Sequence, residues 1–182
     1  MTILDLALLP TGMRDAAAAL LVSEFDTATG WRDGVSARGE VDFVLRDGFA
    51  RAAVVDEQLL GWAGALPEYD GRVWELHPVV VHRSHQRRGV GRALVDAIER
   101  EVRQRGGLTL TLGTDDVDAM TSIGGIDLYP DVIGHLRQLE DRGRQHPFLF
   151  YKRLGFAVTG VMPDANGRGK PDIYMSKRVD DR

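Results

Sequence analysis

The most constraining feature of the sequence is a change of hydrophobic period near residue 85. Residues 73–82 (VWELHPVVVH) form an apolar run of strand length, whereas residues 89–105 have a helical period. A glycine pair at 106–107 ends that helix, and Leu108–Leu112 is another short apolar run. We therefore expect a strand–helix–strand crossover that packs a helix against a sheet. The predicted buried face of the helix consists of Val90, Ala93, Leu94, Ala97, Ile98 and Val102.

Further strands and helices are predicted on either side of this crossover, and the strands extend the same sheet. The opening residues MTILDLALLP predict a first strand, and two short apolar runs separated by Asp56-Glu57-Gln58 predict a hairpin. We expect one domain, residues 1–182, of mixed α/β class with one sheet. The predicted helices are 13–25, Ala37–Arg46 after a loop around Thr27–Gly34, 128–139, and a short one after His146-Pro147 through Leu154; the remaining strands are 50–55, 59–66, 156–161 and 173–176.

Composition narrows the function classes. The 182 residues include no cysteine, which excludes disulfides, thiolate metal sites and thiol nucleophiles. The net charge of -4 argues against binding to nucleic acid and favours a cationic small-molecule substrate. The sequence lacks a basic leader segment and an apolar run of about 20 residues, so we expect no membrane association and a cytoplasmic protein. The five histidines show no metal-binding spacing, and we predict no metal.

Six residues between the predicted strand and helix, QRRGVG at 86–91, have the composition of a phosphate-binding loop. Glycine lets the backbone approach a ligand closely, and the unpaired amides at a helix N-terminus bind phosphate. A P-loop would need a Gly-Lys-Ser/Thr sequence here, and a dinucleotide fingerprint would need glycine or alanine in place of Leu94. A glycine-containing turn without a ligand is the alternative interpretation.

The loop matches the Q/R-x-x-G-x-G/A acetyl-CoA motif of the GNAT superfamily of N-acetyltransferases, and the chain resembles that family. In the family, the strand before the motif is bulged and splays from its neighbour, and the pantetheine arm fills the gap. Pro78 favours such a bulge independently, because proline cannot donate to a strand ladder. The resemblance implies acetyl-CoA as cosubstrate, bound by Val79, Val80, Val81, Gln86, Arg87, Arg88, Gly89, Val90, Gly91, Arg92 and Tyr151. A buried strand explains the three valines as well, and both interpretations can hold together.

Five further blocks lie in order along the chain: WELHPVVV (74–81), LGTDDVDAMTS (112–122), DLY (127–129), HPFLFYKRLGF (146–156) and PDANGRGKPDIYMSK (163–177). Together they resemble the aminoglycoside 6'-N-acetyltransferases, whereas the first 70 residues match more loosely. This resemblance implies a GNAT fold with a mixed central sheet, a bulged and splayed cofactor strand and flanking helices. It also implies a homodimer that transfers acetyl directly to the 6'-amine of an aminoglycoside and so gives resistance to the antibiotic.

Two candidate bases lie in the predicted cofactor strand. A period of two places Glu75 and His77 on one face, just before the predicted bulge. The acceptor amine is mostly protonated at neutral pH, so we assign Glu75 as the base, acting directly or through water, and as an anion that attracts the substrate. A solvated or salt-bridged glutamate is the alternative. His77 is assigned to the substrate site, with a structural hydrogen-bonding role as its alternative.

Two groups are predicted to handle the charge that develops during acyl transfer. The backbone amide of Val79 can donate to the oxyanion at the bulge. Tyr151 matches the family tyrosine near the CoA sulfur, and its hydroxyl can protonate the leaving thiolate. Aromatic packing on a short helix is the alternative interpretation of Tyr151.

Acidic residues after the strand at 108–112 are candidates for binding a polycation. Asp115 and Asp116 lie in the GTDD segment, and Asp172 in KPDI is a similar candidate. For Asp116 and Asp118, a solvated surface position is the alternative. Asp164-Ala165-Asn166-Gly167 predicts a turn between strands.

Two other functions stay open at this point. The chain can be an enzyme of the same class that acetylates another amine, such as a metabolite, a polyamine or a protein N-terminus. The chain can instead be a non-catalytic acyl-CoA-binding module, although the presence of Glu75 and Tyr151 with the loop at 86–91 speaks against it.

Overall fold

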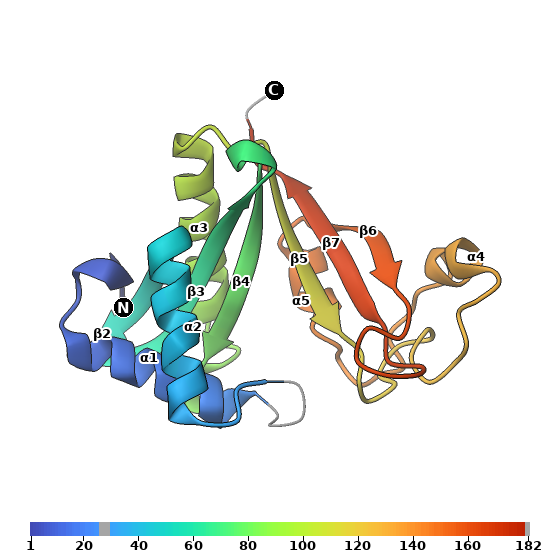
Figure 1. The fold of residues 1–182 in the computed structure, drawn as a ribbon, viewed down its shortest axis with the longest axis horizontal. Helices are drawn as coiled ribbons and strands as arrows, with labels where there is room; N and C mark the ends of the chain where they lie inside the picture. The colour runs from blue at the N-terminus through green and yellow to red at the C-terminus, as the bar shows by residue number, and fades with distance from the viewer. Residues whose placement is uncertain (26–29, 181–182) are drawn as a thin grey trace. The chain divides into compact units, whose positions relative to one another are not determined.

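A computed structural model describes residues 1–25 and 30–180 of the chain (Figure 1). It divides into two compact units, Met1–Leu110 with Val179–Arg182, and Thr111–Arg178. Each unit contains strands and helices, so the predicted mixed α/β class is confirmed. The prediction of a single domain stays a prediction. Residues 26–29 of the loop predicted around Thr27–Gly34 lie outside the described residues.

An antiparallel meander of four strands forms the sheet of the first unit. Its strands are β1 (Thr2–Asp5), β2 (Phe49–Val55), β3 (Gln58–Glu68) and β4 (Val73–Val81), and each pairs with the next. β2 and β3 form the predicted hairpin, and both residues of its turn, Asp56 and Glu57, have positive φ angles. β1 is shorter than the predicted first strand, because the carboxylate of Asp5 accepts a hydrogen bond from the Ala7 amide at 2.9 Å and starts a 3-10 turn.

Helices cover both faces of this meander. α1 (Thr11–Glu24) and α2 (Gly34–Asp47) lie on one face and α3 (Val90–Gln104) on the other (Figure 1). Trp62 of β3 is fully buried, and its indole donates to the Ala17 carbonyl of α1 at 3.1 Å. α2 starts three residues before the predicted Ala37, because Asp33 and Ser36 form a capping box at its N-terminus.

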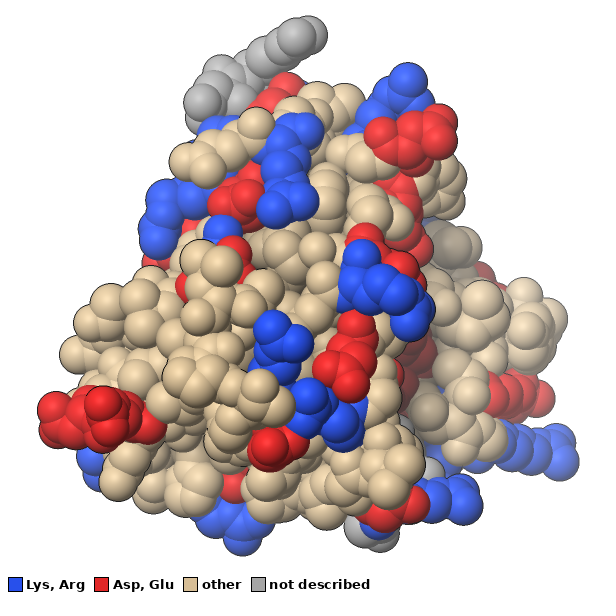
Figure 2. All heavy atoms as spheres, turned by 60° about the vertical axis from the view of Figure 1, so that its left-hand side comes forward, with Lys and Arg blue, Asp and Glu red and all other residues tan. Residues whose placement is uncertain are grey.

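The helix α3 buries the stripe predicted from its period, apart from Ala93, which is only partly buried. Gly106, with φ of 81°, follows the helix and ends it as expected. On the same side, Arg51 of β2 bridges two carboxylates, Asp5 at 2.7 Å and Glu101 at 2.6 Å. Acidic and basic side chains are interspersed in this way over the face drawn in Figure 2. Within the described ranges, no helix is both long and apolar enough to cross a bilayer.

The second unit contains two strands, two short helices and all but the first two residues of a third strand. The strands are β5 (Thr109–Asp115), β6 (Ala157–Met162) and β7 (Asp172–Arg178), in the order β5-β7-β6. β6 and β7 are antiparallel. The helices are α4 (Val132–Arg137) and α5 (Phe148–Arg153), and α5 confirms the short helix predicted after residue 147. In the connection between β6 and β7, Asp164 and Gly167 have the positive φ angles expected of a turn.

The helix predicted over 128–139 is wrong in its extent, because only the six residues of α4 are helical. Pro130 supplies no amide for an earlier turn, and the carboxylate of Asp131 accepts a hydrogen bond from the Gly134 amide at 2.9 Å. The helix therefore begins at Val132. Leu128, which contributed to the helical pattern, is buried in the preceding loop instead.

The loop after β5 is organised around a buried carboxylate. Asp116 has no exposed surface, and its two oxygens accept three hydrogen bonds. The donors are the Met120 amide at 2.6 Å, the Thr121 amide at 2.9 Å and the Thr121 hydroxyl at 2.7 Å. Gly124 leaves room for this group, since a Cβ there would lie 2.2 Å from its Oδ2 atom. The buried side chain thus stabilises the conformation of the loop through these hydrogen bonds.

We expect Asp116→Asn to lower the free energy of unfolding by about 2 kcal/mol, because an amide NH₂ would replace one of the acceptor oxygens and leave buried donors unpaired. Asp118→Asn is the matched control, since the Asp118 residue is exposed, and its effect should stay within about 0.5 kcal/mol. Urea unfolding followed by circular dichroism measures both. Equal stability of the two variants would contradict the role of Asp116 in the loop.

Candidate active site

A bulge interrupts β4 in the middle of the strand. Ala65 of β3 pairs with Leu76, whereas Ala63 pairs with Val79. The two residues His77 and Pro78 therefore oppose the single residue Gly64, which confirms the bulge predicted from the proline. A Cβ on Gly64 would lie 2.5 Å from the His77 carbonyl oxygen, so this position needs glycine.

Glu75 faces the side of the sheet that α1 and α2 cover. It pairs with Leu66, which lies on the same side of β3 as the buried Trp62. The side chain is half-buried. Among the described residues, no hydrogen bond or ion pair occupies its carboxylate. His77 also faces α2, so the prediction that Glu75 and His77 share a face is confirmed.

His77 is held by a carboxylate that sequence reasoning missed. Its Nε2 atom lies 3.2 Å from Oε1 of Glu40 on α2, and the indole Nε1 of Trp31 donates to Oε2 of Glu40 at 3.3 Å. The Trp31 and His77 rings lie 6.0 Å apart. One feature of the sequence could have indicated that Glu40 faces the sheet. It lies three residues after Ala37 and four before Val44, on the buried stripe of α2.

Electrostatics couple His77 to two carboxylates. Burial of the ring lowers its pKa, but the hydrogen bond and charge of Glu40, with the charge of Glu75, outweigh burial and raise the pKa of His77 above its ordinary value. The hydrogen bond from His77, with its charge and the hydrogen bond from Trp31, lowers the pKa of Glu40 against the effect of its burial. His77 and Glu40 thus favour the charged pair.

Val79, Val80 and Val81 complete β4 after the bulge. Val80 lies in the core that α1 and α2 cover, as the buried-strand interpretation expected, whereas Val79 and Val81 are half-buried. Val79 pairs with Ala63 directly after the bulge. The structure therefore places the amide assigned to the oxyanion next to the interruption of the ladder.

The loop at residues 86–91, to which the family resemblance assigns the diphosphate of acetyl-CoA and which we call the diphosphate loop, is exposed over 86–89 and leads into α3. Arg87 and Gly89 have left-handed φ angles of 59° and 86°. α3 begins at Val90, and no side chain caps its first amides. A Cβ on Gly89 would meet nothing within 4 Å. Left-handed residues just before a helix N-terminus with uncapped amides are a common anion-binding arrangement, so these residues fit the diphosphate of acetyl-CoA.

The other residues of the loop have distinct surroundings. The amide group of Gln86 donates to the Val81 carbonyl at 3.0 Å and so ties the loop to the end of β4. Arg88 and Arg92 are exposed, and Gly91 is partly buried in the first turn of α3. Guanidinium groups at these positions add positive charge where the diphosphate is expected.

In the second unit, Tyr151 lies on α5 among aromatic rings. Its ring centroid is 5.0 Å from that of Phe150 and 5.8 Å from that of Phe156. Desolvation of the hydroxyl raises the pKa of Tyr151 to about 12. The phenol therefore keeps its proton at neutral pH, as a proton donor requires.

His146 connects the loop after β5 to the start of α5. The ring is buried, and its Nδ1 atom accepts a hydrogen bond from the Phe148 amide at 3.1 Å. Its Nε2 atom lies 3.0 Å from the Asp115 carbonyl oxygen and must donate to it. Sequence reasoning assigned no role to this histidine, although it opens the HPFLFYKRLGF block at 146–156 and precedes Pro147.

The carboxylates predicted to bind substrate differ in exposure. Asp115 at the end of β5 is exposed and accepts a hydrogen bond from the side chain of Asn166. Asp172 opens the neighbouring strand β7 and lies against Gly113, where a Cβ would be 2.4 Å from its Oδ2 atom. The Asp116 amide donates to the Pro171 carbonyl at 2.9 Å, so Asp115 and Asp172 lie at the same end of the two strands. Only Asp116, of these three, is fully buried.

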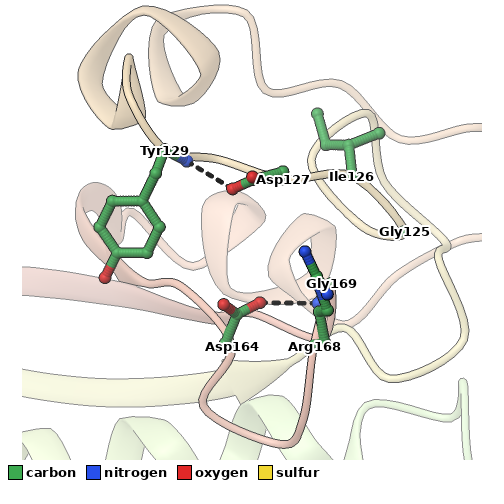
Figure 3. A pocket seen from close by; sticks show the side chains of 7 residues that line it. All are labelled: Gly125, Ile126, Asp127, Tyr129, Asp164, Arg168 and Gly169. Atoms are coloured by element: carbon green, nitrogen blue, oxygen red, sulfur yellow. Dashed lines mark hydrogen bonds between the residues drawn. The ribbon is translucent and has the colours of Figure 1, made fainter.

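A separate cavity of about 620 Å³ opens in the second unit and was not predicted (Figure 3). Two of its lining carboxylates accept main-chain hydrogen bonds, Asp127 from Tyr129 at 3.0 Å and Asp164 from Gly169 at 2.6 Å. Arg168 also lines it. None of the residues assigned from the sequence to catalysis or binding lines this cavity. In the described ranges, no group of three or more His, Asp or Glu residues is arranged to hold a metal ion.

Comparison with known proteins identifies the family. The model of the GNAT acetyltransferase family matches residues 18–124. Similar structures include an aminoglycoside 6'-N-acetyltransferase complexed with coenzyme A, with 37% identity over 100% of this chain and 99% of that chain and a TM-score of 0.92. The aminoglycoside 6'-N-acetyltransferase from Enterococcus faecium has 36% identity over 100% and 99% of the two chains, and a TM-score of 0.88. An aminoglycoside 6'-acetyltransferase type Ii has 34% identity with the same coverage and a TM-score of 0.77.

A search of curated proteins gave no match. The family match covers more than half of the chain and includes β4, the diphosphate loop and α3. The chain belongs to the GNAT family of acetyltransferases and is an acetyl-CoA-dependent N-acetyltransferase.

Proposed function

We propose that the protein is an aminoglycoside 6'-N-acetyltransferase, which acetylates the 6'-amine of the antibiotic by direct attack and so confers resistance. The carboxylate of Glu75 carries the proposal, because it is half-buried beside the bulge and has no ion-pair partner among the described residues. The 34% to 37% identity to three solved aminoglycoside acetyltransferases supports the choice of acceptor.

Glu75 prepares the amine for attack. An ammonium group has no lone pair, so one proton must leave the nitrogen before the carbon–nitrogen bond forms. An unpaired carboxylate accepts that proton, directly or through one water, and its charge attracts the cationic substrate. The chain contains no cysteine, which is consistent with direct transfer without a thiol-bound acyl intermediate.

Two further groups act on the thioester that bound acetyl-CoA supplies. The Val79 amide donates a hydrogen bond to the carbonyl oxygen as negative charge develops there. When the carbon–sulfur bond breaks, the sulfur keeps the electron pair and takes a proton from Tyr151. That role rests on the match of Tyr151 to the family tyrosine.

The acidic residues support a polycationic acceptor. Asp115 and Asp172, at one end of β5 and β7, are the carboxylates that would attract further ammonium groups of the sugar rings. The family resemblance also supports a homodimer, and the cysteine-free composition suits a cytoplasmic location; both are parts of this proposal.

We expect Glu75→Gln to lower kcat for a 6'-amino aminoglycoside by about 100-fold, because the amide cannot accept the ammonium proton. Release of the CoA thiol during steady-state turnover measures this effect. A matched aminoglycoside with a 6'-hydroxyl group should give no turnover with the wild type. Glu68→Gln, at an exposed residue of β3, is the matched control and should keep wild-type kcat.

The outcomes separate the acceptor from the base. Turnover of the 6'-hydroxyl analogue, or no turnover of any aminoglycoside with intact acetyl-CoA binding, would contradict the 6'-amine assignment and leave another amine as the acceptor. Wild-type kcat in Glu75→Gln would contradict the role of Glu75 only.

Tyr151→Phe should lower kcat about 10-fold to 100-fold with little change in the KM for acetyl-CoA, because it removes the proton donor and keeps the ring packed between Phe150 and Phe156. Because the pKa of Tyr151 is about 12, the wild-type rate should show no loss of this donor up to pH 10. Tyr69→Phe, at a residue that is 75% exposed, is the control. A rate for Tyr151→Phe equal to that of the control would reduce Tyr151 to a packing residue.

A further inference from the structure

Three side chains from separate segments meet on the α2 side of β4. Trp31 precedes α2, Glu40 lies within α2 and His77 lies in the bulge. Each oxygen of Glu40 lies close to a different ring nitrogen, Oε1 at 3.2 Å from His77 Nε2 and Oε2 at 3.3 Å from Trp31 Nε1. The capping box of Asp33 and Ser36 fixes the start of α2 next to Trp31. The position of the carboxylate is therefore determined at both oxygens.

The hydrogen bond decides which nitrogen of His77 carries the proton. An ionised carboxylate only accepts, so the Nε2 atom of His77 must donate to Glu40. Nδ1 is then the lone-pair nitrogen of the neutral ring, and no hydrogen bond to Nδ1 is found among the described residues. A carboxylate that fixes the tautomer of a histidine and stabilises its charged form is the arrangement that makes histidine an efficient base.

The reaction releases two protons from the acceptor nitrogen, so a second proton acceptor beside Glu75 has a role. A primary ammonium carries three protons and the amide product keeps one, so two protons leave the nitrogen. The first proton leaves before the attack and the second leaves after it. Overall, the thiolate sulfur gains one proton and the solvent gains the other. Glu75 alone can hold only one of them at a time. His77 lies on the same face as Glu75 and offers a second acceptor.

We infer that Glu40 is a positioning residue that acts through His77: with Trp31, it holds the imidazole in the Nε2–H tautomer and so makes Nδ1 the second proton acceptor beside Glu75. The use of this acceptor rests on the proposed function, whereas the tautomer and the ionisation of His77 do not. Two charged groups act on the ring, Glu40 from α2 and Glu75 from β4. No charged side chain of α1 or β3 is hydrogen-bonded to it in the described structure.

The first test is nuclear magnetic resonance of the ¹⁵N-labelled full chain without ligand, with His77→Gln to assign the signals. We expect His77 in the wild type to titrate above its ordinary pKa and, when neutral, to show the Nε2–H tautomer. In Glu40→Gln the pKa of His77 should fall, since burial is then opposed only by the charge of Glu75, and both tautomers should appear. Asp47→Asn makes the same charge change at an ion pair on the surface of α2 and should leave His77 unchanged.

The second test is a double-mutant cycle in kcat/KM against pH with the acceptor that the wild type uses. Glu40→Gln should lower kcat/KM about 10-fold and shift the acidic limb to lower pH, and Glu40→Asp should retain part of the rate. Glu40→Gln with His77→Gln should be no slower than His77→Gln alone, because Glu40 acts through the ring. Trp31→Phe should have a smaller effect than Glu40→Gln in the same direction.

The two tests distinguish failure of this inference from failure of the proposed function. Unchanged tautomer and pKa of His77 in Glu40→Gln would overturn the inference even if the enzyme acetylates aminoglycosides. Additive losses in the cycle would also overturn it, since Glu40 would then act independently of His77. If no aminoglycoside is turned over, the proposed function fails, and the resonance experiment still decides the role of Glu40.

Discussion

A proline inside β4 cannot donate to the sheet ladder, and the bulge of His77 and Pro78 opposite Gly64 accommodates it. The bulge adds one residue to the strand without a partner. It therefore changes which residues face α2, so Glu75 before it and Val80 after it lie on the same side. The candidate base, the histidine and the amide assigned to the oxyanion all take their positions from this interruption.

Local patterns predicted much of this arrangement. The change of period before α3, the glycines of the diphosphate loop and the alternation of Glu75 and His77 depend on neighbours in sequence, and each was found as expected. Glu40 was missed because its contact with His77 spans 37 residues, and no local pattern encodes which strand a helix covers. The helix predicted over 128–139 failed because capping at Asp131 outweighed the apolar pattern. The buried state of Asp116 also depends on tertiary contacts that a run of acidic residues does not reveal.

Charge is distributed unevenly on the α2 face of β4. Two carboxylates flank one imidazole, so the group of Glu40, His77 and Glu75 has a net charge of about -1 when His77 is protonated and about -2 when it is neutral. A cationic acceptor would stabilise the more negative state, because its positive charge competes with the proton on His77. Binding of the substrate and release of a proton from the ring would thereby favour each other.

The buried ring of His146 joins two parts of the second unit to which the proposed function assigns different tasks. One nitrogen is bonded to the carbonyl of Asp115 and the other to the first amide of α5, the helix that bears Tyr151. Changes in the acidic loop that admit a new acceptor would also move the partner of this ring. Under the proposed function, a shift of the Asp115 backbone that admits a new acceptor would therefore also displace α5 and Tyr151, whereas a change of the Asp115 side chain alone keeps the carbonyl that His146 binds.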